Sequence, residues 1–205
     1  MDIITQTHRP WNKGKLVGQK TPLKPREVWA IRARLELFDH VRELALFNLA
    51  IDSKLRGCDL MKLKVSDVRT GDEYRTRSKV VQKKTGNAVH FEITKLTRQS
   101  LGKWCNKASL SSYDWLFPSR MDTSRHLSTR QYARLVSDWI ISISLPRSSY
   151  STHSLRRTKA TLIYRKTGNL RAIQLLLGHT KIDSTVRYLG VEVDDALALA
   201  ESVEL

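Results

Sequence analysis

The sequence predicts a mainly helical protein with a small three-stranded antiparallel sheet, an α+β arrangement. Two observations support this prediction. Apolar residues recur every three or four positions along most of the chain, which is the period of a helix. In the middle, two short runs rich in β-branched and aromatic residues flank Gly86-Asn87, a pair typical of a hairpin turn.

The N-terminal third is expected to form a basic arm followed by helices. Residues 1–22 carry Pro, Gly and Lys without any period, so we expect a flexible arm there. Lys24-Pro25 then marks a helix start, because Pro fits the first helical turn. Further helices are expected at 39–52 and 57–63. The inward face of the first helix is predicted to hold Val28, Ile31, Leu35 and Phe38.

The middle of the chain is predicted to form the sheet, and the rest to return to helices. The expected strands are 67–75, 79–82 and 89–93. Gly168 and Gly178 stand where glycines commonly end helices, and Ser128 where a side chain caps a helix start. The expected helices are 97–108, 128–143, 156–167, 169–177, 182–189 and 192–203.

Charge divides the chain into three parts. The chain of 205 residues holds 36 Lys and Arg against 20 Asp and Glu, a formal net charge of +16. Such an excess indicates a polyanionic partner, and nucleic acid is the commonest; improved solubility is the alternative reading. From Glu192 onward there are only acidic charges, so this part is expected to face away from the polyanion. The parts are the arm 1–22, one domain at 23–191 and an acidic helix at 192–205.

Other global features exclude several classes of protein. No apolar run approaches about 18 residues, the minimum for a membrane-spanning helix. The first residues lack the apolar core of a secretory signal. The two cysteines, Cys58 and Cys105, are too few for a disulfide framework and are expected to be reduced. We therefore expect a cytoplasmic protein that binds no membrane.

An ordered set of polar residues carries the strongest functional signal. His153 and Arg156 stand three apart, and Tyr188 follows the Leu177-Gly178-His179 tripeptide by nine residues. Arg56 precedes them in the N-terminal third, and Lys84 lies in the predicted hairpin. The set, in this order and at these spacings, resembles the catalytic domain of the tyrosine recombinases, the phage-integrase family. The resemblance covers roughly residues 23–205.

The resemblance implies a site-specific DNA recombinase that cleaves and rejoins DNA through a 3′-phosphotyrosyl intermediate, by integration, excision or inversion. Arg56 and Arg156 would bind the non-bridging phosphate oxygens, since a guanidinium pairs with them bidentately and stays charged. Tyr188 would attack the phosphorus. The remaining roles are His153 as general acid or base, Lys84 as proton donor to the leaving 5′ oxygen, and His179 as donor to a phosphate oxygen.

Supporting residues are assigned around this set. Asp59 stands one helical turn after Arg56 and is expected to orient its guanidinium. The arginines supply the positive charge that a metal otherwise would, so we expect no metal and no cofactor. Contacts to DNA phosphates are expected from Lys83, Arg157, Lys159, Arg165, Lys166 and Arg171.

The chain departs from typical family members at its N-terminal end. They carry a helical domain of about a hundred residues, a usual domain size, that clamps the DNA from the other side. Only 22 residues precede the first predicted helix here, as in minimal members such as the fimbrial switch invertases. We therefore expect weaker DNA binding, or a partner that replaces the clamp.

The resemblance also implies an assembly and leaves alternatives open. The partner would be double-stranded DNA, with a monomer or weak dimer in solution and a tetramer on paired sites. The acidic helix would dock on a neighbouring protomer or pack on its own domain. Two other activities remain open: a topoisomerase-like nicking and closing of DNA, and a regulator or accessory factor that binds DNA without cleaving it.

Overall fold

The computed structural model describes residues 19–190 and Glu201. The predicted flexible arm before Gln19 therefore lies outside the described residues. The same holds for the helix predicted at 192–203, apart from Glu201. No helix in the described part of the chain is both long and apolar enough to cross a membrane.

A helical body surrounds one central helix. In α2 (Val41–Ser53) the residues from Ala45 to Ser53 are all buried, and Leu46, Phe47 and Leu49 are wholly inaccessible. The helices α1 (Pro25–Leu37), α5 (Lys95–Lys107) and α7 (Thr152–Thr167) all pack against α2, which is why this part of the helix is buried on every side. The body is built from α1 (Pro25–Leu37), α2 (Val41–Ser53), α3 (Gly57–Leu60), α4 (Val65–Val68), α5 (Lys95–Lys107) and α6 (Thr129–Ser142).

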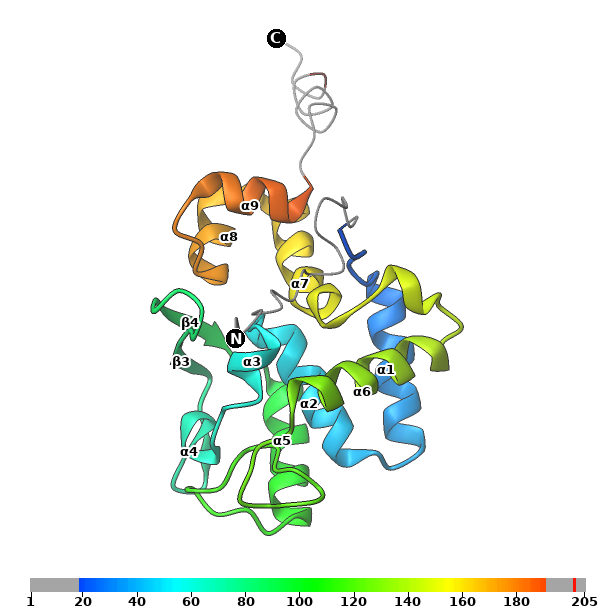
Figure 1. Cartoon of the computed structure of the whole chain (residues 1–205), viewed down its shortest axis with the longest axis vertical. Coiled ribbons are helices and arrows are strands. Elements are labelled where there is room, and N and C mark those ends of the chain that lie inside the picture. Colours follow the sequence, from blue (N-terminus) through cyan, green and yellow to red (C-terminus); the bar gives the residue numbers. More distant parts are fainter. Residues whose placement is uncertain (1–18, 191–200, 202–205) are drawn as a thin grey trace, which may run out of the picture.

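A second, smaller apolar core lies at the opposite end of the molecule from α5 (Figure 1). It is formed by α7, α8 and α9, and its buried residues are Ala160, Ile173, Leu177 and Leu189. The helix α7 belongs to both cores, since Leu155 near its start packs in the larger one. The elements of this part are the 3-10 turn η1 (Arg147–Ser149), α7 (Thr152–Thr167), α8 (Leu170–Leu177) and α9 (Ile182–Leu189).

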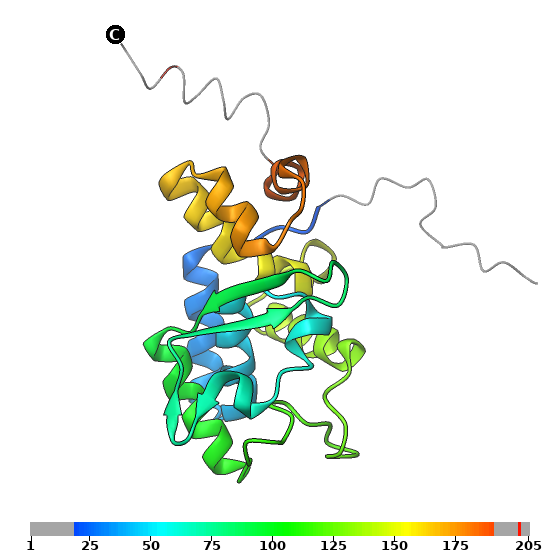
Figure 2. The same ribbon diagram turned by 90° about the vertical axis from the view of Figure 1, so that its left-hand side faces the viewer.

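The strands form two separate antiparallel hairpins instead of the predicted three-stranded sheet. Gly71 takes a left-handed φ of 57°, so the chain reverses there and Thr70 pairs with Glu73. The segment predicted as the third strand therefore pairs with itself. The hairpin predicted around Gly86-Asn87 is confirmed and runs across one face of the body (Figure 2). The strands are β1 (Arg69–Thr70), β2 (Glu73–Tyr74), β3 (Arg77–Val81) and β4 (Ala88–Glu92).

Several helix ends follow the sequence signals, whereas the helix predicted at 57–63 already ends at Leu60 and α5 begins two residues before its predicted start at 97. Ser128 caps α6, and Gly168 and Gly178 end α7 and α8 in the left-handed conformation, as predicted. Phe38 was predicted to face the core, but it lies just beyond α1 and is 61% exposed. The start of α7 lies at Thr152, four residues before the predicted start, because Ser151 caps the helix there.

Candidate active site

The position of Arg56 follows from the way α2 ends. Lys54 adopts a left-handed φ of 55°, which turns the chain out of the helix, and Leu55 is buried beside it. Arg56 is then extended and immediately precedes α3. Gly57 packs closely on Tyr132, since a Cβ at Gly57 would lie 3.2 Å from that ring. Arg56 is thereby fixed at the surface of the body, facing the β3–β4 hairpin.

The start of α7 presents His153 and Arg156 together. The Ser151 hydroxyl accepts a hydrogen bond from the backbone N–H of His153, which fixes the first turn. Arg156 follows one turn later and is only 3% exposed. Its Nη2 donates to the carbonyl oxygen of Leu177 at 2.8 Å, whereas its Nη1 is buried without a partner among the described residues. One side of this guanidinium is therefore free to bind another group.

A close approach between two elements places His179. Gly178 ends α8 with a φ of 65°, and a Cβ there would lie 2.4 Å from the side chain of Val89 on β4. Only glycine therefore fits between α8 and the hairpin. His179 follows directly, and its Nδ1 lies 3.0 Å from Thr185 Oγ1 on α9. This contact links the end of α8 to the helix that carries Tyr188.

Tyr188 lies among the other predicted residues. The His179 ring is 5.4 Å from its ring, edge on at 79°. The Arg156 and Arg157 guanidiniums lie 5.8 and 5.6 Å from the centre of the Tyr188 ring. The phenol oxygen is buried and has no hydrogen-bond partner among the described residues. Ser137 Oγ and Thr161 Oγ1 are buried in the same way, so what distinguishes Tyr188 is its position beside the two guanidiniums.

The environment sets the protonation states of the site. Burial, partly offset by the charges of Arg156 and Arg157, raises the pKa of Tyr188 to about 12. Burial and the cations Arg156 and Arg56 lower the pKa of His179 to about 4. His153 is exposed at the surface, and partial desolvation together with the charges of Arg156 and Arg56 lowers its pKa. At neutral pH both histidines are therefore neutral and the phenol is protonated.

The hairpin brings Lys84 toward this group. Lys84 is exposed in the loop between β3 and β4, and its charge is among those that lower the pKa of His153. Lys83 is also exposed, while its backbone N–H donates to Asp59 Oδ1 at 2.9 Å. The structure thus gathers Arg56, Lys84, His153, Arg156, His179 and Tyr188 on one side of the molecule.

Asp59 does not have the contact predicted for it. Its carboxylate holds the backbone of Lys83, and no hydrogen bond joins it to Arg56 among the described residues. The partner of Arg56 is Gln82, whose Oε1 accepts from Nη1. The helical spacing that suggested the pair does not apply, because Arg56 precedes α3 in an extended conformation.

Two residues predicted to contact DNA phosphates are placed otherwise. Arg157 is buried, and its guanidinium donates to the carbonyl oxygens of Lys20 and Leu189, at 2.8 and 3.4 Å. It therefore joins the chain before α1 to the end of α9. Lys159 is held in ion pairs within the protein. The side chains of Lys83, Arg165, Lys166 and Arg171 are exposed, so phosphate contacts by these four stay a prediction.

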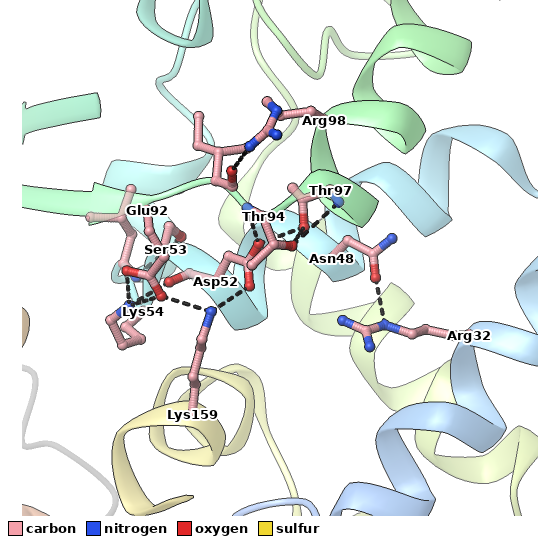
Figure 3. Close-up of polar contacts among 12 residues, drawn as sticks. Arg32, Asn48, Asp52, Ser53, Lys54, Glu92, Thr94, Thr97, Arg98 and Lys159 are labelled. Carbon is pink, nitrogen blue, oxygen red and sulfur yellow. Dashed lines mark hydrogen bonds and ion pairs between the residues drawn. The ribbon is translucent and has the colours of Figure 1, made fainter. Parts of the chain in front are cut away.

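The ion pairs of Lys159 belong to a charge-paired cluster, defined by Asp52, Lys54, Glu92 and Lys159 (Figure 3). The wholly buried Lys54 Nζ lies 2.8 Å from both oxygens of Glu92. The Lys159 Nζ is 2.7 Å from Asp52 and 2.7 Å from Glu92. Asp52 also accepts hydrogen bonds from the backbone of Thr94 and from the hydroxyl of Thr97. The cluster joins the end of α2, the strand β4 and the helix α7, which lead to Arg56, Lys84 and Arg156.

Sequence reasoning missed the residues that support the site. Gln82 is 1% exposed and contacts Arg56, yet a lone glutamine beside two lysines gave no signal. Lys54 and Arg157 stand next to recognised residues, but their charge suggested exposure. Among the described residues no group of three His, Cys, Asp or Glu side chains is arranged to hold a metal ion.

Comparison with known proteins identifies the family. The model of the phage integrase family matches residues 22–194, and the chain belongs to this family. Tyrosine recombinase XerC of Erythrobacter litoralis is 30% identical over 159 residues, 78% of this chain and 49% of XerC. The Bacillus subtilis protein named "Probable integrase/recombinase YoeC" is 27% identical over 77% of this chain and 82% of its own length. This chain thus spans about half the length of XerC and most of YoeC.

Solved structures show the same fold. The crystal structure of XerA recombinase superposes with a TM-score of 0.73 at 21% identity, over 90% of this chain and 65% of XerA. XerH site-specific recombinase, bound to a palindromic difH substrate, gives a TM-score of 0.69 at 21% identity, over 90% of this chain and 53% of XerH. The mainly helical class and the tyrosine recombinase catalytic-domain fold are thereby confirmed.

Proposed function

We propose that the protein is a site-specific DNA recombinase that cleaves and rejoins DNA through a 3′-phosphotyrosyl bond. The observation that carries the proposal is the surrounding of Tyr188. The buried phenol lies beside Arg156 and Arg157, the charge of Arg56 also acts on it, and Arg156 Nη1 is buried with no hydrogen-bond partner among the described residues. A phosphodiester is the group that uses both, since its phosphorus accepts the phenol and its oxygens accept guanidinium hydrogen bonds.

The residues divide the reaction as follows. Arg56 and Arg156 bind the non-bridging oxygens, where negative charge grows in the transition state. The Tyr188 oxygen bonds to phosphorus as the bond to the 5′ oxygen breaks. The phenol proton passes to the neutral imidazole of His153, and Lys84 gives a proton to the leaving 5′ oxygen. Burial raises the pKa of the resting phenol to about 12, so the phenol is protonated before DNA binds. The reverse steps rejoin DNA without an external energy source.

The test is covalent attachment of DNA. Fluorescent duplexes that tile the DNA on both sides of the gene are mixed with the protein in EDTA and separated on a denaturing gel. We expect one tile to give a covalent adduct with the wild type, and EDTA to leave its yield unchanged. Tyr188→Phe is expected to abolish the adduct and to change DNA affinity by no more than about threefold, because the ring keeps its packing.

Other outcomes separate the competing functions. A mobility shift under native conditions with no adduct from any tile would favour a regulator or accessory factor. An adduct from Tyr188→Phe would assign the nucleophile elsewhere. Relaxation of supercoiled plasmid without exchange between two sites would indicate topoisomerase-like nicking and closing.

The proposal extends to location and assembly. The protein would act on chromosomal or phage DNA in a bacterial cytoplasm, as a monomer or weak dimer free and as a tetramer on paired sites. The acidic residues from Glu192 onward would dock on a neighbouring protomer. Truncation after Gly190 is expected to retain binding by one protomer and to abolish recombination. Full recombination by the truncated protein would contradict docking in trans, and unfolding would indicate packing in cis.

A further inference from the structure

A buried glutamine connects the two arginines of the site. Gln82 directly follows β3 and is 1% exposed. Its Oε1 accepts from Arg56 Nη1, and its Nε2 donates to the carbonyl oxygen of Leu177 at 3.1 Å. The same carbonyl accepts from Arg156 Nη2 at 2.8 Å. One continuous chain of hydrogen bonds therefore runs from the first guanidinium to the second.

The chemistry of this chain requires an amide. Arg56 can only donate and a carbonyl oxygen can only accept, so the connecting side chain must offer one acceptor and one donor. Of similar length, Glu lacks the donor and Met lacks both groups. These partners also fix which end of the Gln82 amide is oxygen and which is nitrogen. Thr85 Oγ1 donates to the same oxygen at 3.0 Å, which further holds that orientation.

The packing around Gln82 leaves little freedom for another arrangement. A Cβ on Gly178 would lie 3.0 Å from Gln82 Oε1 and 2.4 Å from Val89, so α8 presses directly on the hairpin at this point. The next residue, Lys83, is held through its backbone by Asp59. The hairpin is thus held by α8 at Gln82 itself and by Asp59 at the next residue.

We infer that Gln82 is a positioning residue that sets the separation and direction of Arg56 and Arg156, and that links both to the hairpin carrying Lys84. The inference rests on the proposed function, in which both arginines bind one phosphate. Two guanidiniums bind one phosphate well only when they are held in place beforehand, because ordering them during the reaction costs free energy. Arg156 has its own carbonyl partner, whereas Arg56 depends on Gln82.

The first test uses the tile that becomes attached to the wild-type protein. Gln82→Met keeps the length of the side chain and removes both hydrogen bonds, and Gln99→Met on the exposed face of α5 serves as the matched control. We expect Gln82→Met to slow adduct formation at saturating DNA by on the order of 100-fold, with DNA affinity within about threefold. Gln99→Met is expected to match the wild type. A wild-type rate for Gln82→Met would overturn the inference.

A second test does not depend on cleavage. The charge of Arg56 contributes to the low pKa of His179, so a misplaced Arg56 should let that pKa rise. In an NMR titration, the pKa of His179 is expected to be higher in Gln82→Met than in the wild type, and higher still in Arg56→Gln. A rise in Arg56→Gln alone, with Gln82→Met unchanged, would overturn the inference. Gln82→Glu provides the comparison if Gln82→Met fails to fold, and its rate of adduct formation is expected to fall because the donor to Leu177 is lost.

The two tests keep the proposals apart. If the wild type forms no adduct with any tile, the proposed function fails while the titration still decides whether Gln82 positions Arg56. If the wild type forms the adduct and Gln82→Met does so at the same rate, only the role of Gln82 is refuted.

Discussion

The charge-paired cluster and the candidate active site share the helix α7, yet their charged groups are paired to different extents. In the cluster each cation has a carboxylate within 2.8 Å, and Asp52 accepts two further hydrogen bonds. In the site, Arg56, Arg156, His153 and His179 form no ion pair with the described residues. The cations of the cluster are paired with carboxylates of the same chain, whereas the cations of the site are not.

The charge-paired cluster stabilises the fold, whereas the candidate active site has cations that are not paired within the chain. Removing charge from water costs several kcal/mol for each ion unless a partner compensates for it. The cluster provides this compensation within the chain. In the site, Arg156 Nη1 and the Tyr188 hydroxyl form no hydrogen bond with the described residues, and a buried polar group in that position costs stability. We therefore expect charge variants in the cluster to lower stability more than activity, and charge variants in the site to lower activity more than stability.

The largest effect is expected from Arg156→Gln. Loss of the guanidinium should slow adduct formation by on the order of 1000-fold, because a fixed charge on the transition state is lost. The free energy of unfolding should stay within about 1 kcal/mol of the wild type, since no carboxylate loses a partner. Gel quantification of the adduct and urea unfolding measure the two quantities. A large loss of stability would show that Arg156 belongs to the fold as much as the cluster does.

Glu92→Gln is expected to lower stability more than activity. It leaves the wholly buried ammonium of Lys54 without its carboxylate, which should lower the free energy of unfolding by about 2–4 kcal/mol. Urea unfolding again gives the measurement. The double variant Lys54→Met with Glu92→Gln removes both charges and should recover part of the loss. If the single variant is as stable as the wild type, the ion pair contributes nothing and the contrast between the regions disappears.

The smallest effect concerns pH. The pKa of His179 is about 4 in the folded protein and 6.5 when unperturbed, so between these values only the unfolded chain gains the proton. Stability should therefore be full above pH 6.5 and should fall as the pH drops toward 4. The half-exposed ring limits the loss to about 1 kcal/mol. Urea unfolding at pH 7 and pH 5 measures it, and His179→Asn should flatten the difference. An equal slope in both proteins would assign the pH dependence to other groups.

The sequence predicted which residues lie in the candidate site, but not which residues hold them in place. The order and spacing of Arg56, His153, Arg156, His179 and Tyr188 carried the resemblance to the family, and their catalytic roles stay a prediction. The spacing cannot show which atom contacts which. The partner expected for Arg56 was therefore wrong, and Gln82 was missed.

The helices were predictable because each follows a local signal, such as the cap at Ser128 or the glycine at position 168. The errors arose where the outcome depended on distant partners. Arg157 and Lys159 were assigned to DNA from their charge and their closeness to the motif, yet carbonyls and carboxylates far along the chain bind them. The segment 67–75 was assigned to the larger hairpin, although its own turn at Gly71 satisfies it locally.

The division of the interior into two cores has a consequence for hydrogen exchange. Among the described residues, four buried side chains form the smaller core, and Tyr188 packs against it, whereas Arg56 belongs to the larger body. Regions with few buried contacts open at a lower free energy than the whole protein. Amides in α8 and α9 should therefore exchange faster than those in α2. Tyr188 is therefore carried by the part of the molecule that is expected to open more easily, and Arg56 by the part that is expected to stay closed.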